Sequence, residues 1–200
     1  MKRTDADPPP DRTAHAPMST FVALLRGVNV GTGRRVPMAT LRELMTGLGL
    51  VDVRTLLNSG NAVYDLPGAP VPAPWQARDI AAALLAQLGL TVPVIVKSAK
   101  QLASIVDENP WGQSAADPAR LLVVFTQEAA TLAALRVIEG LVIAPESFHV
   151  GRHAAFLHCP AGILESRAGT ALLGSAGRAA TTRNWATVLK LQAMCAPQIG

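Results

Sequence analysis

The chain has 200 residues, of which 50% are hydrophobic and 16% are charged. Together with a mean hydropathy of +0.28, this composition excludes a generally disordered chain, because it offers enough apolar side chain to bury a core. No apolar run approaches the roughly 18 residues that a membrane span requires. We therefore expect a soluble globular protein of one large domain or two small ones.

The net charge of +4 is unevenly distributed along the chain. The excess of basic residues falls in the segments 20–66 and 150–200, whereas the segment 67–149 is mildly acidic. That distribution suits an anionic ligand, such as a phosphate compound or a nucleic acid, although a composition rich in arginine explains it equally well. Aromatic residues make up only 4% of the chain, so stacking platforms for bases are scarce.

Residues 1–17 combine several prolines with alternating charges and show no apolar periodicity. They lack the apolar segment of a secretory signal, which favours a cytoplasmic protein. We expect a disordered leader over residues 1–17, with the fold beginning near Met18.

Residues 18–98 predict the order strand, helix, strand, strand, helix, strand. The apolar run 21–25 has the length of a strand, and Pro37 followed by helically spaced apolar residues predicts a helix that ends near Gly49. The remaining elements of this segment are expected at 53–57, 62–64, 80–88 and 92–96. This order is that of a ferredoxin-like unit.

Residues 99–118 are expected to form a connecting helix and loop, and the pattern then partly recurs over residues 119–200. Strands are expected at 121–125, 147–150 and 154–158, and helices at 128–139 and 185–194. No last strand is evident. We therefore predict an α+β fold of two ferredoxin-like units, with antiparallel or mixed sheets and helices on one face, the second unit being incomplete.

A loop rich in glycine and arginine follows the first strand, over residues 26–35. Arg26 can supply bidentate donors, and Asn29 and Gly31 can let a ligand approach the backbone. The loop leads into a helix N-terminus, which favours anions. It matches neither the P-loop nor the dinucleotide-binding glycine pattern, and a turn with solvated arginines is the alternative.

Two further polar segments are candidates for a ligand site. In the turn 58–61, Ser59 and Asn61 offer hydrogen-bonding groups, although a simple hairpin turn explains them too. We expect this turn at the opposite end of its sheet from the 26–35 loop. The segment 181–185 is expected to open the last helix, with a threonine as its N-cap and with Arg183 and Asn184 facing an anion; Arg183 as an ordinary surface residue is the alternative.

The sequence does not assign a catalytic residue. Cys159 and Cys195 are not spaced as a redox or zinc pair, and His149, His153 and His158 lack the helical spacing of metal ligands. We expect reduced thiols, no metal centre and no cofactor.

Three separated segments carry a resemblance to a known family. The residues Phe21 to Gly31, with Val36-Pro37-Met38 after them, resemble the opening signature of the bacterial domain-of-unknown-function family 1697. The stretch 53–63 and the segment Thr181 to Trp185 followed by 188–191 are similar to later signatures of that family, and Asn109-Pro110-Trp111 agrees with it. The resemblance implies a cytoplasmic bacterial protein of two ferredoxin-like halves and no established activity. The segment 161–167 departs from the Gly-, Ser- and Lys-rich stretch expected there.

The leading hypothesis is a domain that binds an anionic or phosphate-bearing ligand. The candidate ligand-binding residues are Arg26, Asn29, Gly31, Ser59, Asn61, Arg183 and Asn184. One alternative is a small enzyme acting on a nucleotide or another phosphorylated metabolite. A second is weak binding of single-stranded nucleic acid on an open sheet face, although the aromatic residues of that mode of recognition are missing. No membrane partner is expected, and the sequence does not predict the oligomeric state.

Overall fold

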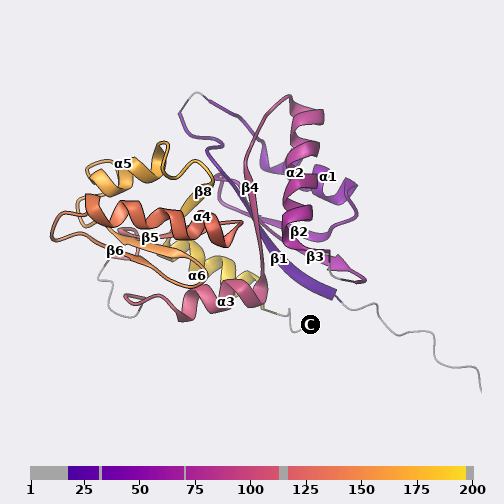
Figure 1. The fold of residues 1–200 in the computed structure, drawn as a ribbon. Helices are drawn as coiled ribbons and strands as arrows, with labels where there is room; N and C mark the ends of the chain where they lie inside the picture. The colour runs from indigo at the N-terminus through magenta and orange to yellow at the C-terminus, as the bar shows by residue number, and fades with distance from the viewer. Residues whose placement is uncertain (1–17, 32, 70, 113–116, 197–200) are drawn as a thin grey trace, which may run out of the picture.

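The computed structural model describes residues 18–31, 33–69, 71–112 and 117–196. Two halves lie side by side, each built on a four-stranded antiparallel sheet (Figure 1). The expected leader, residues 1–17, lies outside the described residues. Among the described helices, none is long and apolar enough to cross a bilayer.

The first half has the strand order β2-β3-β1-β4. Its strands are β1 (Met18–Leu25), β2 (Val51–Leu56), β3 (Asn61–Pro67) and β4 (Val94–Ser98), and its helices are α1 (Met38–Gly47) and α2 (Ala73–Leu88). The C-cap of α2 is Gly89 with φ +66°, and Gly49, two residues after α1, has φ +81°, a conformation that other residues rarely adopt. This half is the predicted ferredoxin-like unit.

The second half repeats the same topology as β6-β7-β5-β8. Its strands are β5 (Leu121–Thr126), β6 (Ser147–Val150), β7 (Ala155–His158) and β8 (Ala180–Asn184); its helices are α4 (Ala129–Ala134), the 3-10 helix η1 (Leu135–Leu141) and α5 (Arg167–Leu173). The two helices that follow β4 and β8 are α3 (Ala99–Asp107) and α6 (Trp185–Met194). The prediction of two ferredoxin-like units is confirmed.

The prediction that the second unit is incomplete was wrong. Residues 180–184 form the last strand of the second unit, β8, which pairs with β5 and has Arg183 opposite Val123. The helix α5 precedes this strand. The sequence does not predict this strand, because Ala-Thr-Thr-Arg-Asn has no apolar alternation. The N-cap of α6 is Asn184, whose side chain accepts from the Thr187 N–H at 2.9 Å, and not a threonine. The helix expected over 128–139 is divided into α4 and η1.

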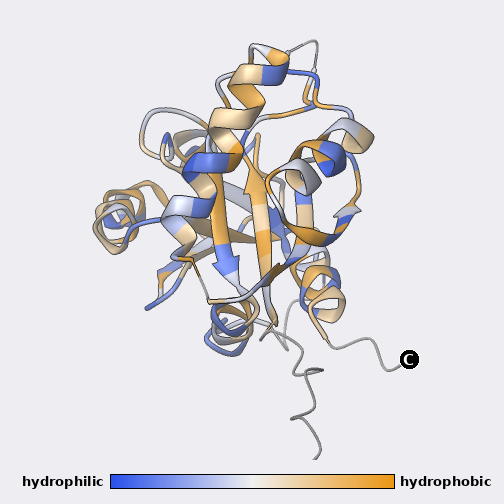
Figure 2. Ribbon diagram, turned by 90° about the vertical axis from the view of Figure 1, so that its right-hand side faces the viewer, coloured by the Kyte–Doolittle hydropathy of each residue, from blue (hydrophilic) through white to orange (hydrophobic). Residues whose placement is uncertain are grey.

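Both faces of each sheet are covered, whereas helices had been expected on one face only. In β1, Phe21, Ala23 and Leu25 face α1 and α2, and the alternate residues Val22 and Leu24 face the opposite way. There they join one core with residues of β5, β7, α3 and α6. A third core lies between β5 and the helices η1 and α5. Figure 2 shows the apolar strands in the middle and mixed helices around them.

The turn between β2 and β3 lies at the same end of the sheet as the loop after β1, and the expectation of opposite ends was wrong. The reason is the antiparallel pairing of β1 with β3, in which Leu24 is opposite Asn61. The end of β1 is therefore beside the start of β3.

Candidate functional site

A cavity of about 440 Å³ lies between the two halves. From the first half it is lined by residues 25–28, Val30, Leu57 and Ser59, and from the second half by residues 172–173, 180–184 and Thr187. All three polar segments singled out in the sequence contribute to it. Ligand pockets of proteins commonly have volumes of about 300–1,000 Å³, so this one has room for a small organic molecule.

The turn before β3 approaches the end of β1 closely because its last residue is a glycine. The Leu25 N–H donates to the Gly60 carbonyl at 2.8 Å. Gly60 has φ +74°, and a Cβ placed on it would be 2.6 Å from both Leu25 Cβ and Val28 Cγ2. Only glycine allows this contact, which positions Ser59 on the wall of the cavity.

Arg183 is buried, with 9% of its surface exposed, and its guanidinium joins the two halves. In the first half it donates to Asn61 Oδ1 and to the carbonyls of Leu25 (2.8 Å), Ser59 (3.1 Å) and Gly60 (3.3 Å). In its own strand it donates to Thr181 Oγ1 (2.9 Å) and the Thr182 carbonyl (2.8 Å). Every one of its nitrogens is therefore engaged, and Arg183 is a structural link as well as a cavity residue.

The charge of Arg183 forms no ion pair with a carboxylate among the described residues. None of the ion pairs in the described part of the chain includes this residue, and all its acceptors are neutral. Burial lowers its pKa to about 10, because desolvation disfavours the charged form. At neutral pH the wall of the cavity thus contains a desolvated positive charge that is not compensated by an ion pair.

Arg26 also links the halves, but it belongs to the first half and donates to acceptors of the second. Its side chain donates to the carbonyls of Gly177, Ala180 (2.5 Å) and Leu173 (2.9 Å) in the second half. These bonds use three of its five N–H groups among the described residues. Burial, with a smaller contribution from Arg34, lowers the pKa of Arg26. Arg26 thus brings a second positive charge to the cavity, and its remaining donors are on Nε and Nη2.

Asn29 has a structural role in the loop after β1. It is in the left-handed region with φ 57°, which asparagine tolerates better than most residues. Its amide donates to the carbonyls of Val36 (2.8 Å) and Asn58 (2.7 Å), and its carbonyl oxygen accepts from the Val36 N–H (2.9 Å). Asn29 therefore closes the loop and ties it to the neighbouring turn.

The other predicted residues divide into two groups. Ser59 and Asn184 line the cavity along with Arg26 and Arg183. Asn61 is fully buried and holds the turn, donating to the Leu56 carbonyl and Ser59 Oγ at 3.0 Å each, while Gly31 is exposed on the loop. Neither Asn61, Gly31 nor Asn29 lines the cavity.

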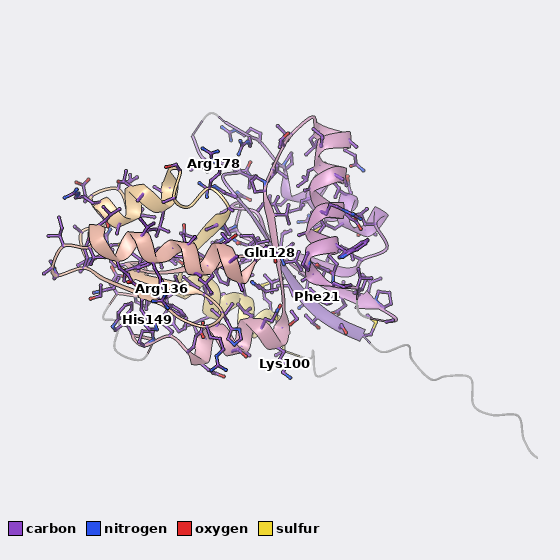
Figure 3. All side chains as sticks on the ribbon, in the orientation of Figure 1. Phe21, Lys100, Glu128, Arg136, His149 and Arg178 are labelled. Atoms are coloured by element: carbon purple, nitrogen blue, oxygen red, sulfur yellow. The ribbon has the colours of Figure 1, made fainter. Side chains whose placement is uncertain are left out.

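Sequence reasoning missed the apolar part of the lining. Val30, Leu57 and Leu173 are 67%, 58% and 47% exposed, and all three line the cavity. Isolated apolar residues in loops carry no signal in a single sequence. The helix that contains Leu173 was not predicted, so its contribution could not be anticipated. Figure 3 labels Arg178 in the segment that joins this helix, α5, to β8.

The first half contains a counterpart of Arg183 in Lys97. Lys97 is opposite Val22 and precedes Ser98, the N-cap of α3, just as Arg183 is opposite Val123 and precedes the N-cap of α6. Lys97 is also buried, at 8% exposure, and burial lowers its pKa while the charge of Glu128 opposes that shift. Figure 3 shows Glu128 close to β4. Among the described residues, the counterpart therefore has a carboxylate that influences its charge, whereas burial alone shifts the pKa of Arg183.

The geometry defines a protein of two ferredoxin-like halves with an electropositive cavity at their junction. The family model described as "Protein of unknown function (DUF1697)" matches residues 18–156, and the chain belongs to this family. No curated protein matches the sequence. A solved structure of a conserved bacterial protein from Streptococcus pneumoniae is similar, with a TM-score of 0.74 and 23% identity, over 90% of this chain and all of that one. At this identity the similarity shows the fold alone.

Proposed function

We propose that the cavity between the two halves binds a small anionic ligand that bears a phosphate or a carboxylate. The observation that carries the proposal is the buried charge of Arg183, which no described carboxylate compensates. An anion in the cavity would supply that compensation at short range and in a partly desolvated setting, where Coulomb attraction is stronger than in water.

The two arginines have different roles in this proposal. Arg183 contributes charge, because its N–H groups already donate to protein acceptors. Arg26 contributes charge and its remaining N–H groups, which are suited to an oxyanion. The Ser59 hydroxyl lines the same wall and accepts from Asn61, so its own proton can be donated to a ligand oxygen. The N-terminus of α6, where Asn184 and Thr187 lie, adds a favourable dipole.

Binding is favoured over catalysis by the side chains of the cavity. Its described lining includes no carboxylate, imidazole, thiol or amine, so general acid–base chemistry would have to come from the ligand or from elsewhere. Cys159 is buried in the core between β5 and α5, away from this lining. An enzyme acting on a phosphorylated metabolite stays the alternative.

Recognition of single-stranded nucleic acid on an open sheet is disfavoured, because both faces of each sheet are covered in the described part of the chain. We further propose that the protein acts in the bacterial cytoplasm. Two cysteines without a disulfide and a structural relative from a bacterium support this setting.

The test is calorimetric titration of the full chain with a phosphate monoester and with inorganic phosphate. The proposal predicts saturable binding to the wild type and at least a tenfold loss of affinity in Arg26→Gln, which removes charge from the cavity. Lys97→Met is the matched control, because it removes the counterpart charge outside the cavity lining and is expected to bind as the wild type does. Absence of saturable binding, or an equal loss in both variants, would contradict the proposal.

A further inference from the structure

The exposed part of the cavity lining includes three large apolar side chains, and its buried part includes polar ones. Arg183 and Thr181 are buried at 9% and 5% exposure, and they lie beside the end of β1. Val30, Leu57 and Leu173 are exposed at 67%, 58% and 47% and come from three separate segments. Single exposed apolar residues are normal on protein surfaces, but three around one cavity form a surface to which a ligand can bind.

Leu57 is the most informative of these residues. It has φ 56°, the left-handed region that glycine and asparagine adopt easily and that branched aliphatic residues rarely adopt. Its side chain is 58% exposed, so burial in the core does not account for a leucine at this position. The turn therefore presents an apolar group at the cavity despite an unfavourable backbone conformation, which is a common property of binding sites.

The volume of the cavity is also larger than an inorganic anion would fill. Its volume of about 440 Å³ is many times the roughly 30 Å³ that one water molecule occupies in the liquid. A phosphate group beside Arg26 and Arg183 would fill only part of it. The remaining space is next to the three exposed apolar side chains.

From these observations, and resting on the proposed function, we infer that the occupant is an organic phosphate whose body is apolar and about the size of an aromatic ring. Its phosphate lies toward Arg26, Ser59 and Arg183, and its body contacts Val30, Leu57 and Leu173. Both halves of the protein contact it, so that binding holds them together. Free inorganic phosphate would satisfy the charge but leave these apolar side chains exposed to water.

The experiment compares three probes by calorimetry: inorganic phosphate, glycerol 3-phosphate and phenyl phosphate. It uses the wild type, Leu57→Asn and Leu164→Asn. Asparagine suits the backbone of residue 57, so the first variant should fold, which its thermal melt checks. Leu164 is 76% exposed and does not line the cavity, so its variant is the matched control.

Phenyl phosphate is expected to bind the wild type at least tenfold more tightly than the other two probes. Leu57→Asn should remove most of that preference and leave the affinity for inorganic phosphate unchanged, while Leu164→Asn should keep it. Equal affinities of the three probes for the wild type would overturn this inference and leave the proposed function standing. A preference that survives Leu57→Asn would also overturn it. Failure of all three probes to bind would overturn the proposed function itself.

Discussion

Replacing Arg183 by lysine tests how far one side chain holds the two halves together. Lysine keeps the positive charge but has three N–H donors in place of five and no planar fork. It can therefore satisfy only some of the acceptors that Arg183 engages, which include Asn61 Oδ1 and the carbonyls of Leu25 and Gly60. At least two of these groups lose their charged donor.

The cost follows from the energy of unsatisfied buried acceptors. Each such group costs about 1–3 kcal/mol, so two of them give about 2–6 kcal/mol. Water in the adjoining cavity can satisfy some of them, which favours the lower half of that range. We expect Arg183→Lys to lower the free energy of unfolding by about 3 kcal/mol.

Urea unfolding followed by tryptophan fluorescence measures this change, and Trp185, which directly follows β8 and is buried, should report it. Lys97→Met is the control at the equivalent position of the first half. Burial of Lys97 penalises its charge, and methionine is an aliphatic side chain of similar length. We therefore expect Lys97→Met to change the free energy of unfolding by no more than about 1 kcal/mol. Equal stabilities of Arg183→Lys and the wild type would refute the structural role of Arg183.

Three more predictions concern the loops and the charge. Gly60→Ala should destabilise the fold by about 3 kcal/mol or more, because the added Cβ would overlap Leu25 and Val28. Gly68 also has a positive φ but has open space around it, so Gly68→Ala should cost only about 1 kcal/mol. Thermal melts of the two variants measure both costs. Asn29→Asp should cost about 2 kcal/mol in chemical unfolding, because the donors to Val36 and Asn58 are lost while the acceptor for the Val36 N–H is kept. Benzoate, a ligand that bears a carboxylate, should bind equally well at all pH values between 6 and 9. Its binding should weaken as the pH rises through about 10, because the pKa of Arg183 is lowered to about 10 and the side chain loses its charge there. A titration step near pH 7 would instead point to a histidine or a carboxylate with a raised pKa in the site.

The sequence was sufficient for the fold class because apolar runs of strand length and helically spaced leucines follow the ferredoxin-like order. It was insufficient for β8, whose strand conformation depends on pairing with β5 and on hydrogen bonds of Arg183 with the other half. Local pattern carries no information about such a partner. The same reason explains why Arg183 could not be distinguished from a surface arginine.

The candidate site was predictable in its polar part only. Arg26, Ser59, Arg183 and Asn184 stand out as polar residues at loop and helix boundaries, and they line one cavity. Asn29 and Asn61 have the same chemical character, yet the structure uses them to hold backbone carbonyls. Which asparagine faces a ligand and which closes a turn depends on tertiary contacts that sequence spacing does not specify.

Amide chemical-shift mapping during a titration with phenyl phosphate tests the central claim most directly. If the cavity at the junction binds the anion, saturating shifts should appear together in the first half at Gly27 and Ser59 and in the second half at Thr182 and Thr187. The amides of Lys97 and Ser98, at the equivalent position outside this cavity, should stay unmoved. Shifts confined to one half, or centred on Lys97, would contradict a shared site between the two halves.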